Sequence, residues 1–551
     1  MSIYDKSSLV LIPSGTKTGK VFSQKPVSGD GDFTFTRASA ATRVNADGNI
    51  EKETGNLFTY SNDLSNAIWQ LGLITATSGQ AGYDGSSDAW LITKDAAAYR
   101  AIEHDINNSG VYTYSVYAKA NTLNLISLRD QTLGQGAGFN LTNGTTYGNS
   151  GVSSSIDSVG GGWYRCSVTF NGSSTRLAIY IDFDNATAGS VFVQDFQLEQ
   201  GLVARDVITT TTTALYGGIT DNTPRLDYTD SSCPALLLEP QRTNYVRSSE
   251  YYDTSANWIL SNGVSVEDNF TISPEGVQNA SKVTLSAGIS AFLYTSLSGM
   301  GIPAGDVIIS CWAKADSAIT IGMNDGTVNP NSIDLTTEWK RFEFNFTWTG
   351  SGGFQVDNYF GVSPSNQEKV FYLWGVQAEA GNYSTSYIPT YGSSVTRVND
   401  SSSVTGASDL IGQTEGSLFV DFVFNGLQTN AAADSAFLSL NQQFYAVSYI
   451  TISNYNGTLY GRLTNGLSVD ANITAGGLTL GQRYKCLITY KQNEFKFYVN
   501  GVLQGIDTSV SIPATNGVYF NNDHYPSRGV NQALVIPTAL TDQEAIDLTT
   551  I

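Results

Sequence analysis

Alternation of polar and apolar positions is the main pattern along this chain, and helical periodicity over long stretches is almost absent. The stretch YTYSVYAKA at 112–120 is an example, because Tyr112, Tyr114 and Tyr117 are mixed with small residues, as in a half-buried strand. Gly- and Asn-rich stretches separate such segments at the spacing of a strand plus a turn. The pattern predicts an all-β protein made of β-sandwiches.

The C-terminal part has its own pattern. The stretch 484–505 predicts two strands and a tight turn at Asn500-Gly501, which is a strong hairpin signal. The stretch 532–551 predicts a strand and a short helix, with Thr541 as N-cap and Glu544 at the third helical position of a capping box. All eight tryptophans lie between residues 69 and 374, so this change in composition marks a domain boundary near residue 391.

A long segment of the chain occurs twice. VFVQDFQLEQGLVARDVITT at 191–210 matches FYLWGVQAEAGNYSTSYIPT at 371–390 with a constant offset of 180 residues. Further segments match in the same order: 162–170 with 338–346, 114–122 with 309–317, 81–93 with 272–284, and 60–71 with 249–260. We therefore expect two copies of one unit of about 145 residues, each an antiparallel jelly-roll sandwich.

The order of motifs in the repeat resembles a known family. An opening S…W, a (D/E)G…A turn, a (Y/W)AKA strand, a W-x-R strand and a closing Q-x-E-x-G…Y-I-P-T resemble the carbohydrate-binding-module-like jelly rolls of bacteriophage structural proteins. The second copy matches more fully, since it keeps SYIPT at 386–390, whereas the closing turn of the first copy, with RDVIT at 205–209, departs from the pattern. In the C-terminal part, FYVNG and a closing P-x-A-L-T-x-x-E resemble laminin-G-like, concanavalin A-like sandwiches.

Residues 9–51 and 222–244 resemble two halves of one block of phage tail and virion proteins, in which the halves usually lie close together. The first jelly roll therefore looks inserted, and we expect residues near 52 and near 215 to approach each other and the block to fold as one small β element. The predicted domains are a virion-attachment block at 1–55 completed by 215–244, a first jelly roll at 56–210, a block and linker segment at 211–244, a second jelly roll at 245–392, and a laminin-G-like or concanavalin A-like domain at 393–551.

Composition narrows the possible partners. The chain has 551 residues, a net charge of −20 and a pI near 4.4, so it needs several cores and has no concentrated cations for nucleic acid or anionic membranes. We expect neither a signal peptide nor a transmembrane segment. Four scattered cysteines predict buried free thiols, and two distant histidines argue against a His-based zinc site.

No catalytic set stands out. GTKTGKV at 15–21 lacks the spacing of a phosphate loop and the Ser/Thr after Lys20, so we interpret it as a polar turn. Carboxylates are plentiful, but nothing singles out a glycosidase pair. We therefore predict a protein that is not an enzyme, with a polysaccharide-degrading enzyme as a remote alternative.

Several residues are candidates for binding. Asp84 and Glu275 precede glycines at matching positions of the repeat, which suggests a structural calcium ion or a plain acidic turn; no other cofactor is expected. Aromatic rings can stack on sugars, but the tryptophans shared by the two copies are more simply core residues. The shared tryptophans are Trp69 and Trp258, which open the copies, and Trp163 and Trp339, which lie in strands.

The favoured glycan candidate is the loop at 519–529, because aromatic and polar groups at a sandwich rim suit sugar recognition. Its alternative is an ordinary surface loop. The candidate residues are Tyr519, Asn521, Asn522, Asp523, His524, Tyr525 and Arg528. Separately, Arg43 and Arg397 share a Thr-Arg-Val-Asn motif, and each either pins a junction through backbone carbonyls or lies in a coincidental polar strand.

The resemblance implies a phage virion protein. Its expected function is that of a tail-fibre or tail-tip receptor-binding protein that binds host surface polysaccharide, contacts other virion proteins through its N-terminal block and forms a homotrimer. The alternative is a capsid decoration or head-fibre protein. Adding copies of one jelly roll supplies either binding surface or spacer length, and multiple weak sugar sites act by avidity.

Overall fold

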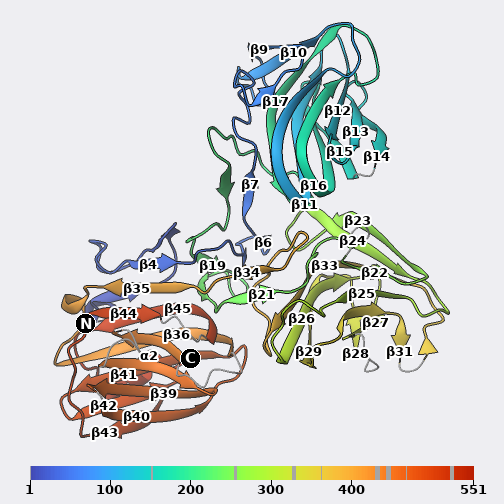
Figure 1. Cartoon of the computed structure of the whole chain (residues 1–551). Coiled ribbons are helices and arrows are strands. Elements are labelled where there is room, and N and C mark those ends of the chain that lie inside the picture. Colours follow the sequence, from blue (N-terminus) through green and yellow to red (C-terminus); the bar gives the residue numbers. More distant parts are fainter. Residues whose placement is uncertain are drawn as a thin grey trace.

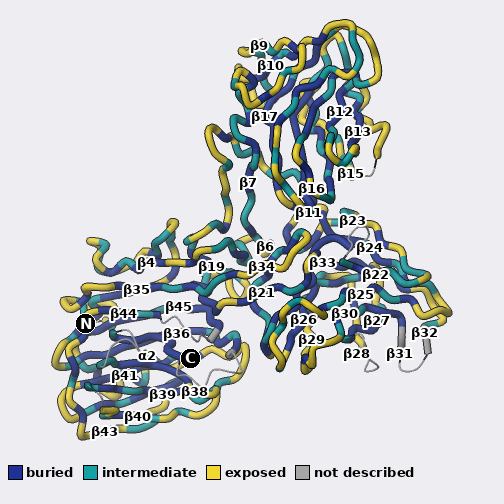
Figure 2. The backbone as a smooth tube through the Cα atoms, viewed as in Figure 1, coloured by how far each residue is buried: buried dark blue, intermediate teal, exposed yellow. Residues whose placement is uncertain are grey.

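The computed structural model describes residues 2–150, 153–252, 257–325, 331–360, 363–427, 435–441, 448–466, 468–520 and 526–551. Within these ranges the chain forms three β-sandwiches, which Figure 1 shows as separate bodies. The all-β prediction is confirmed, because the described helices are short: α1 (Ile3–Lys6), η1 (Ser408–Leu410) and α2 (Asp542–Thr549). Figure 2 shows that buried residues fill each sandwich while exposed residues collect at turns and edges.

The C-terminal sandwich has two large sheets. One sheet follows the order β19 (Arg225–Asp227), β20 (Ala235–Leu238), β45 (Pro526–Ile536), β36 (Glu415–Leu427), β41 (Arg483–Lys491), β42 (Glu494–Val499) and β43 (Val502–Asp507), with β1 (Leu9–Leu11) also paired to β45. The other follows the order β2 (Thr16–Lys17), β3 (Lys20–Val21), β4 (Phe33–Thr36), β35 (Ser401–Thr405), β44 (Gly517–Phe520), β37 (Ser435–Leu440), β38 (Tyr449–Tyr455), β39 (Thr458–Asn465) and β40 (Ser468–Gly477).

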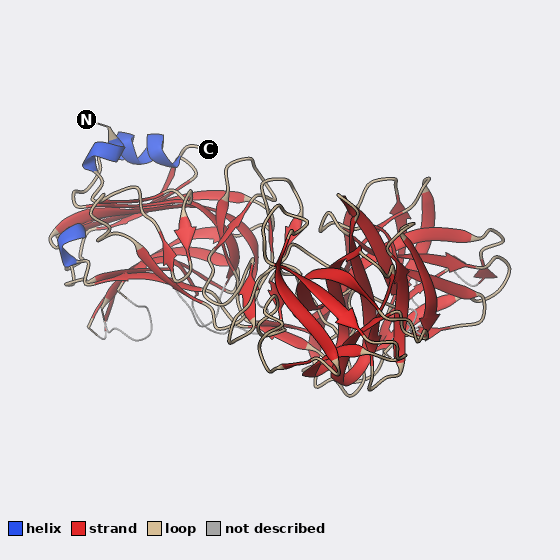
Figure 3. Ribbon diagram, turned by 90° about the horizontal axis from the view of Figure 1, so that it is seen from above, coloured by secondary structure: helices blue, strands red, loops and turns tan. Residues whose placement is uncertain are grey.

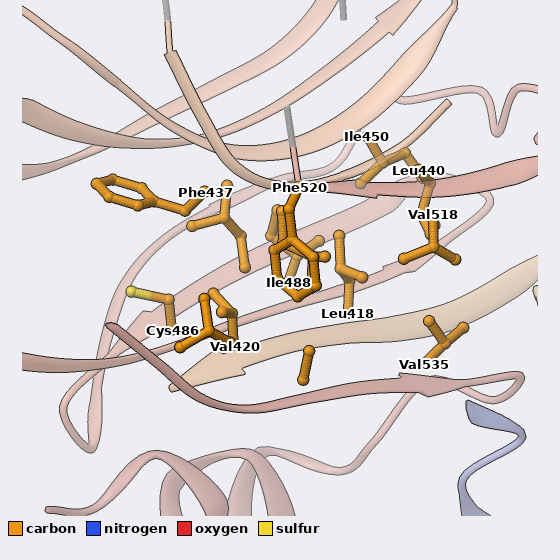
Figure 4. Packing of buried hydrophobic residues seen from close by; sticks show 14 of the residues in the cluster. Leu418, Val420, Phe437, Leu440, Ile450, Cys486, Ile488, Val518, Phe520 and Val535 are labelled. Carbon is orange, nitrogen blue, oxygen red and sulfur yellow. The ribbon is translucent and has the colours of Figure 1, made fainter. Parts of the chain in front are cut away.

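The expectation that the N-terminal block folds as one small element is wrong. Its strands extend the C-terminal sandwich instead: Leu9 pairs with Val535 in one sheet, and Thr36 pairs with Ser401 in the other. The physical reason is burial. The side chains of Leu9, Leu11, Val21, Phe33, Phe35, Leu236 and Leu238 all enter the C-terminal core, part of which Figure 4 shows around Leu418 and Phe520. Short strands could not bury these side chains by themselves.

The two chain ends lie on the same sandwich. Figure 3 shows helix α1 beside α2, and Lys6 of α1 forms an ion pair with Glu544 of α2. The predicted capping box of α2 is confirmed, since Thr541 and Glu544 cap each other's backbone N–H groups. The predicted Asn500-Gly501 hairpin turn is also confirmed, with φ of 49° and 79° between β42 and β43, as a type I′ turn requires.

Two chain segments connect the first jelly roll to the rest. The strand β7 (Thr54–Asn56) pairs antiparallel with β18 (Leu215–Gly217), matching Gly55 with Tyr216. The predicted approach of residues near 52 and 215 is therefore confirmed. The two connecting segments run side by side between the first jelly roll and the rest of the molecule (Figure 1). Two further short pairs lie at the junction: β5 (Arg43–Val44) with β6 (Ile50–Glu51), and β21 (Arg242–Asn244) with β34 (Val395–Arg397).

The two repeat copies share one topology. The first comprises β8 (Trp69–Gln70), β9 (Ile74–Gln80), β10 (Ala89–Lys94), β11 (Ala101–Ala120), β12 (Leu125–Asp130), β13 (Gln135–Asn140), β14 (Thr145–Ser150), β15 (Ser153–Gly160), β16 (Trp163–Ile181) and β17 (Gly189–Gln200). The second comprises β22 (Ile259–Leu260), β23 (Val264–Ile272), β24 (Gln278–Leu285), β25 (Phe292–Ser296), β26 (Gly305–Lys314), β27 (Ile319–Asn324), β28 (Asn331–Leu335), β29 (Lys340–Trp348), β30 (Gly353–Asp357), β31 (Tyr359–Phe360), β32 (Ser363–Pro364) and β33 (Lys369–Ala380).

The copies differ in how the chain passes between their two layers. In the first, β11 and β16 run unbroken through both layers, and β11 pairs with β16 from Ala101 to Lys119. In the second, loops divide the corresponding stretches into β25 and β26 and into β29 and β30. Gly110, where β11 bends, has φ of 90°, and a Cβ there would lie 1.9 Å from the carbonyl oxygen of Tyr391. This glycine lets the two jelly rolls touch.

The matching closing segments form the same buried hydrogen-bond network in both copies. Gln377 donates to Glu379 at 2.7 Å, and its carbonyl oxygen accepts from the N–H of Ile388 at 2.6 Å. In the first copy, Gln197 makes the equivalent bonds to Glu199 and Ile208 at 2.7 and 2.8 Å. All four Gln and Glu side chains are buried. The repeated segment therefore has the same structural role in both copies, which is to close the sandwich.

A buried asparagine completes each network. The Asn244 amide donates to the carbonyls of Ile388 and Val376 and accepts from the N–H groups of Val246 and Ala378. Asn56 makes the equivalent four bonds in the first copy. Because its amide satisfies four backbone groups, each asparagine joins the start of its jelly roll to the closing strand.

Replacing Asn244 by alanine is expected to lower the stability of the second jelly roll by about 2–3 kcal/mol, because buried backbone groups lose their partners. Asn56→Ala should have the same effect on the first jelly roll. Calorimetric unfolding of both variants tests this, with the exposed Asn382→Ala as control. A change in Asn244→Ala no larger than that of the control would contradict the prediction.

The cysteine prediction is partly wrong. Cys166, Cys311 and Cys486 are buried free thiols, and burial raises the pKa of each. Cys233 is free but exposed. It lies in the polar turn between β19 and β20, where the adjacent Ser231 and Ser232 are exposed as well.

Candidate functional site

The two residues predicted as calcium ligands lie in different surroundings. Asp84 is exposed, and its carboxylate caps the N–H of Ser86 at 3.0 Å in a turn. Glu275 is buried, with Lys52 at 3.1 Å and Arg205 at 2.9 Å. Burial alone would raise the pKa of Glu275, but these two cations outweigh it and lower the pKa. Since two cations already neutralise this carboxylate, Glu275 serves as an ion-pair partner at the junction and the calcium prediction for it is wrong.

Over the described ranges, no group of three or more His, Cys, Asp or Glu side chains is arranged to hold a metal ion. The described helices include none that is long and apolar enough to cross a membrane.

The predicted glycan loop is only partly within the described residues. Asn521, Asn522, Asp523, His524 and Tyr525 lie outside them. Tyr519 is half-buried in β44, while Arg528 is fully buried in β45, with its guanidinium 5.7 Å from the Phe437 ring centre. The assignment of Arg528 as a ligand-binding residue is therefore wrong, because its side chain faces the sandwich interior.

The tryptophans shared by the two copies divide into two kinds. Trp69 and Trp258 are buried, and the indole N–H of each donates to a backbone carbonyl at 2.8 Å. Trp163 is buried as well. These three confirm the core interpretation. Trp339, the counterpart of Trp163, is only half-buried and lines a groove.

This groove, called here the tryptophan groove, has a volume of about 600 Å³, within the range of ligand pockets. Trp312 in β26 and Trp339 before β29 lie in its wall. The opposing walls come from the hairpin β5–β6, the turn after β19 and the C-terminal sandwich. These other walls contribute Thr42, Arg43, Val44, Gly48, Asn49, Ile50, Asp227, Thr229, Asp230, Leu237, Glu239, Asn425 and Ser527.

Local structure fixes both indoles. The indole N–H of Trp339 donates to the carbonyl of Ile272 at 2.9 Å. Trp312 lies on an irregularity between β26 and β33 and packs edge-on against the fully buried Trp374, with ring centres 5.3 Å apart. Trp312 is half-buried as well. Two aromatic surfaces are thus held rigidly in one concave wall.

Cations lie over both indole rings. The Arg341 guanidinium is 4.6 Å from the Trp312 ring centre, and the Lys314 ammonium is 5.2 Å from that of Trp339. These distances are typical of cation–π contacts. Arg341 also donates to the hydroxyl of Ser310 and the carbonyl of Thr385, both at 2.8 Å. Both cations are therefore already engaged by the protein.

Carboxylates dominate the remaining charge of the groove. Asp230 and Glu343 are exposed, and Asp227 is half-buried. Burial, with the nearby charge of Asp227, raises the pKa of Asp230. The Glu343 carboxylate accepts from the hydroxyl of Ser384. The groove thus combines aromatic surface with acceptors for hydroxyl donors.

In the described part of the first jelly roll, a second aromatic ring covers the counterpart of this aromatic surface. Tyr117 occupies the position of Trp312, and Tyr83 stacks directly on it, with ring centres 3.7 Å apart and ring planes inclined by 4°. The residue at the position of Tyr83 in the second copy is Pro274. Because proline has no ring that reaches this far, the aromatic surface that Tyr83 covers in the first copy lines the groove in the second.

A network of ion pairs closes the base of the junction. Glu239 accepts from Arg225 at 2.6 Å and Arg397 at 2.9 Å, while Asp400 accepts from Arg37 at 3.1 Å and also from Arg225. All five side chains are at most 3% exposed. Glu239 also accepts from the N–H and hydroxyl of Ser386 in the second jelly roll, so it ties that roll to the C-terminal sandwich.

The prediction for the two Thr-Arg-Val-Asn arginines is half confirmed. Arg397 donates to the carbonyl of Pro240 at 2.8 Å and pins the junction as expected. Arg43 instead donates to the carboxylate of Glu51 at 2.8 Å across its own hairpin. It is part of the groove wall rather than a junction anchor.

Comparison with known proteins gives structural matches alone. No protein-family model matches the sequence, and no curated protein matches it. Solved structures similar to part of the chain include the CBM40 of Ruminococcus gnavus IT-sialidase bound to α2,3-sialyllactose. That match has 16% identity and a TM-score of 0.23, and it covers 26% of this chain and 87% of that one.

Two further structures are similar to a comparable share of the chain. Domain 4 of AbnA, a GH43 extracellular arabinanase from Geobacillus stearothermophilus, matches at 13% identity and a TM-score of 0.23, covering 31% of this chain and 82% of that one. The binding domain of botulinum neurotoxin serotype D matches at 14% identity and a TM-score of 0.23, covering 26% and 38%.

Proposed function

We propose that this chain is a structural protein of a bacteriophage virion, a tail-fibre or tail-tip protein whose tryptophan groove binds a glycan of the host surface. The observation that carries the proposal is the groove itself. Trp312 and Trp339 offer rigid aromatic surface, and hydroxyl, amide and carboxylate groups surround them. Such a combination suits sugars, which have apolar faces and polar edges.

The difference between the two jelly rolls supports a different role for each. Tyr83 stacks on the aromatic surface of the first copy, whereas Pro274 stands at the equivalent position of the second, where Trp312 and Trp339 remain half-buried in the groove wall. We therefore assign binding to the second jelly roll and a spacer or positioning role to the first. The motif order of both copies, which resembles phage virion jelly rolls, supports the virion assignment.

The N-terminal segment, through which the resemblance implies contact with other virion proteins, is part of the C-terminal sandwich. Attachment through this segment places the C-terminal sandwich against the virion, and the first jelly roll then projects from it (Figure 1). A homotrimer, which the resemblance also implies, would present three grooves to one cell surface. Weak sites then act together through avidity.

An adsorption competition tests the proposed function. Purified chain is added to host cells before the phage that encodes it, and free phage are counted. Wild-type protein should reduce adsorption in a dose-dependent manner. Trp312→Ala should need at least about 30-fold more protein, since a central aromatic anchor is worth about 2 kcal/mol. The exposed Tyr455→Ala of the C-terminal sandwich is the control and should compete like wild type.

Equal competition by Trp312→Ala and wild type would contradict the assignment of the groove. No competition at saturating protein, together with antibody labelling of the phage head, would overturn the receptor-binding role and favour the head-fibre alternative. Folding of each variant is checked by calorimetry, because Trp312 also packs against Trp374.

A further inference from the structure

We propose that the tryptophan groove selects neutral, hydroxyl-rich glycans and rejects both acidic and amine-bearing ones. This inference rests on the proposed function and adds the chemical class of the ligand. It follows from which charged groups of the groove are exposed and which are held by other groups of the protein.

An acidic glycan would meet exposed carboxylates in the groove. Asp230 and Glu343 are exposed in the groove, whereas its two arginines are engaged by the protein. Arg341 donates to Ser310 and Thr385, and Arg43 donates to Glu51. Both arginines among the described residues that line the groove already hold protein partners, so a ligand carboxylate would have to compete with those partners for a cation. The net charge of −20 for the whole chain adds repulsion at longer range.

A cationic ligand is disfavoured for a different reason. Carboxylates and indoles would ordinarily suit an amine, but both indoles here already carry a cation. Arg341 lies over Trp312 at 4.6 Å, and Lys314 lies over Trp339 at 5.2 Å. An amine placed on either ring would be repelled by the cation already present at that ring.

A neutral sugar satisfies the groups that remain. Each sugar hydroxyl donates one hydrogen bond and accepts others, so it can donate to the Asp230 and Glu343 carboxylates and accept from the Asn425 amide. Hydrogen bonds to carboxylates are stronger than those between neutral groups. The apolar face of the sugar ring packs against indole surface, which excludes water from these bonds.

The test is a microarray of neutral, acidic and amine-bearing bacterial glycans, probed with the full chain as wild type, Trp312→Ala and the double variant Asp230→Asn/Glu343→Gln. Glycans whose signal falls at least about tenfold in Trp312→Ala define ligands of the groove. These should be neutral, and their binding should change less than about twofold between low and moderate salt. The double variant should bind them more weakly and should gain at least about fivefold on carboxylated analogues of the same glycans.

The possible outcomes distinguish failure of the neutral-glycan inference from failure of the proposed glycan-binding function. Trp312-dependent binding of acidic or amine-bearing glycans would overturn the neutral-glycan inference while leaving glycan binding intact. Trp312-dependent binding of neutral glycans that the double variant leaves unchanged, with no gain on acidic ones, would also overturn it. If no glycan depends on Trp312, the proposed function itself fails, and the inference fails with it.

Discussion

Replacing Glu239 by glutamine is expected to lower the free energy of unfolding of the C-terminal sandwich by about 3–5 kcal/mol. The substitution keeps the shape of the side chain but removes its charge. Three arginines, Arg37, Arg225 and Arg397, would then share the single carboxylate of Asp400 in a site that excludes water. Breaking a buried network by removing one partner is costly because the remaining charges lose their compensation.

The stability that Glu239 contributes is also expected to depend on pH. Burial acts to raise the pKa of Glu239, but the charges of Arg397 and Arg225 outweigh it and hold the pKa well below its ordinary value. A carboxyl group with a lowered pKa contributes stability above its unfolded pKa of about 4.3, and this contribution disappears as the pH falls toward the folded value. The difference between wild type and Glu239→Gln should therefore be full at neutral pH and shrink below about pH 4.

Differential scanning calorimetry suits this measurement, because all eight tryptophans lie outside the C-terminal sandwich core and tryptophan fluorescence would not report on it directly. Glu103→Gln is the matched control. Glu103 also pairs with an arginine, Arg176, at 3.1 Å, but the side chains are 24% and 38% exposed, so its loss should cost less than about 1 kcal/mol. Equal effects of the two substitutions would show that the buried network does not stabilise the junction.

The repeat was recognisable in the sequence because both copies close their sandwiches through the same local contacts. Gln197 and Gln377 close their sandwiches through the same hydrogen bonds, so folding preserves them at matching positions. Asn56 and Asn244 perform equal roles, and a search of the segment just before each copy for a shared asparagine could have found them. Features set by contacts within one unit were therefore accessible from the pattern alone.

Features set by long-range contacts were not accessible. Leu9 pairs with Val535 across almost the whole chain. A short apolar segment does not by itself indicate with which distant strand it pairs. The groove has the same origin, since its walls come from the hairpin at 43–51, the second jelly roll and the C-terminal sandwich. Aligning Trp163 with Trp339 suggested two core residues. The environment of Trp339 differs because other parts of the chain border it.

Replacing Pro274 by tyrosine is expected to close the tryptophan groove and to weaken glycan binding by at least about 100-fold. In the first jelly roll the equivalent Tyr83 stacks on Tyr117 at 3.7 Å with nearly parallel rings. A tyrosine at 274 can adopt the same stacked arrangement on Trp312, since the turns match: Gly85 and Gly276, the glycines that follow, have φ of 85° and 78°. The ring would occupy the surface on which a sugar packs, and a blocked anchor costs at least as much as a truncated one.

Titration of the glycan identified on the microarray measures this effect. Pro274→Ala separates filling of the groove from loss of the proline and should weaken binding far less than Pro274→Tyr. Tyr83→Ala is the matched change in the first jelly roll and should leave binding unchanged, because we assign a spacer role to that copy. Full binding by Pro274→Tyr would show that the ligand does not contact Trp312. A gain of binding by Tyr83→Ala would show instead that the first copy keeps a latent site, which Tyr83 normally covers.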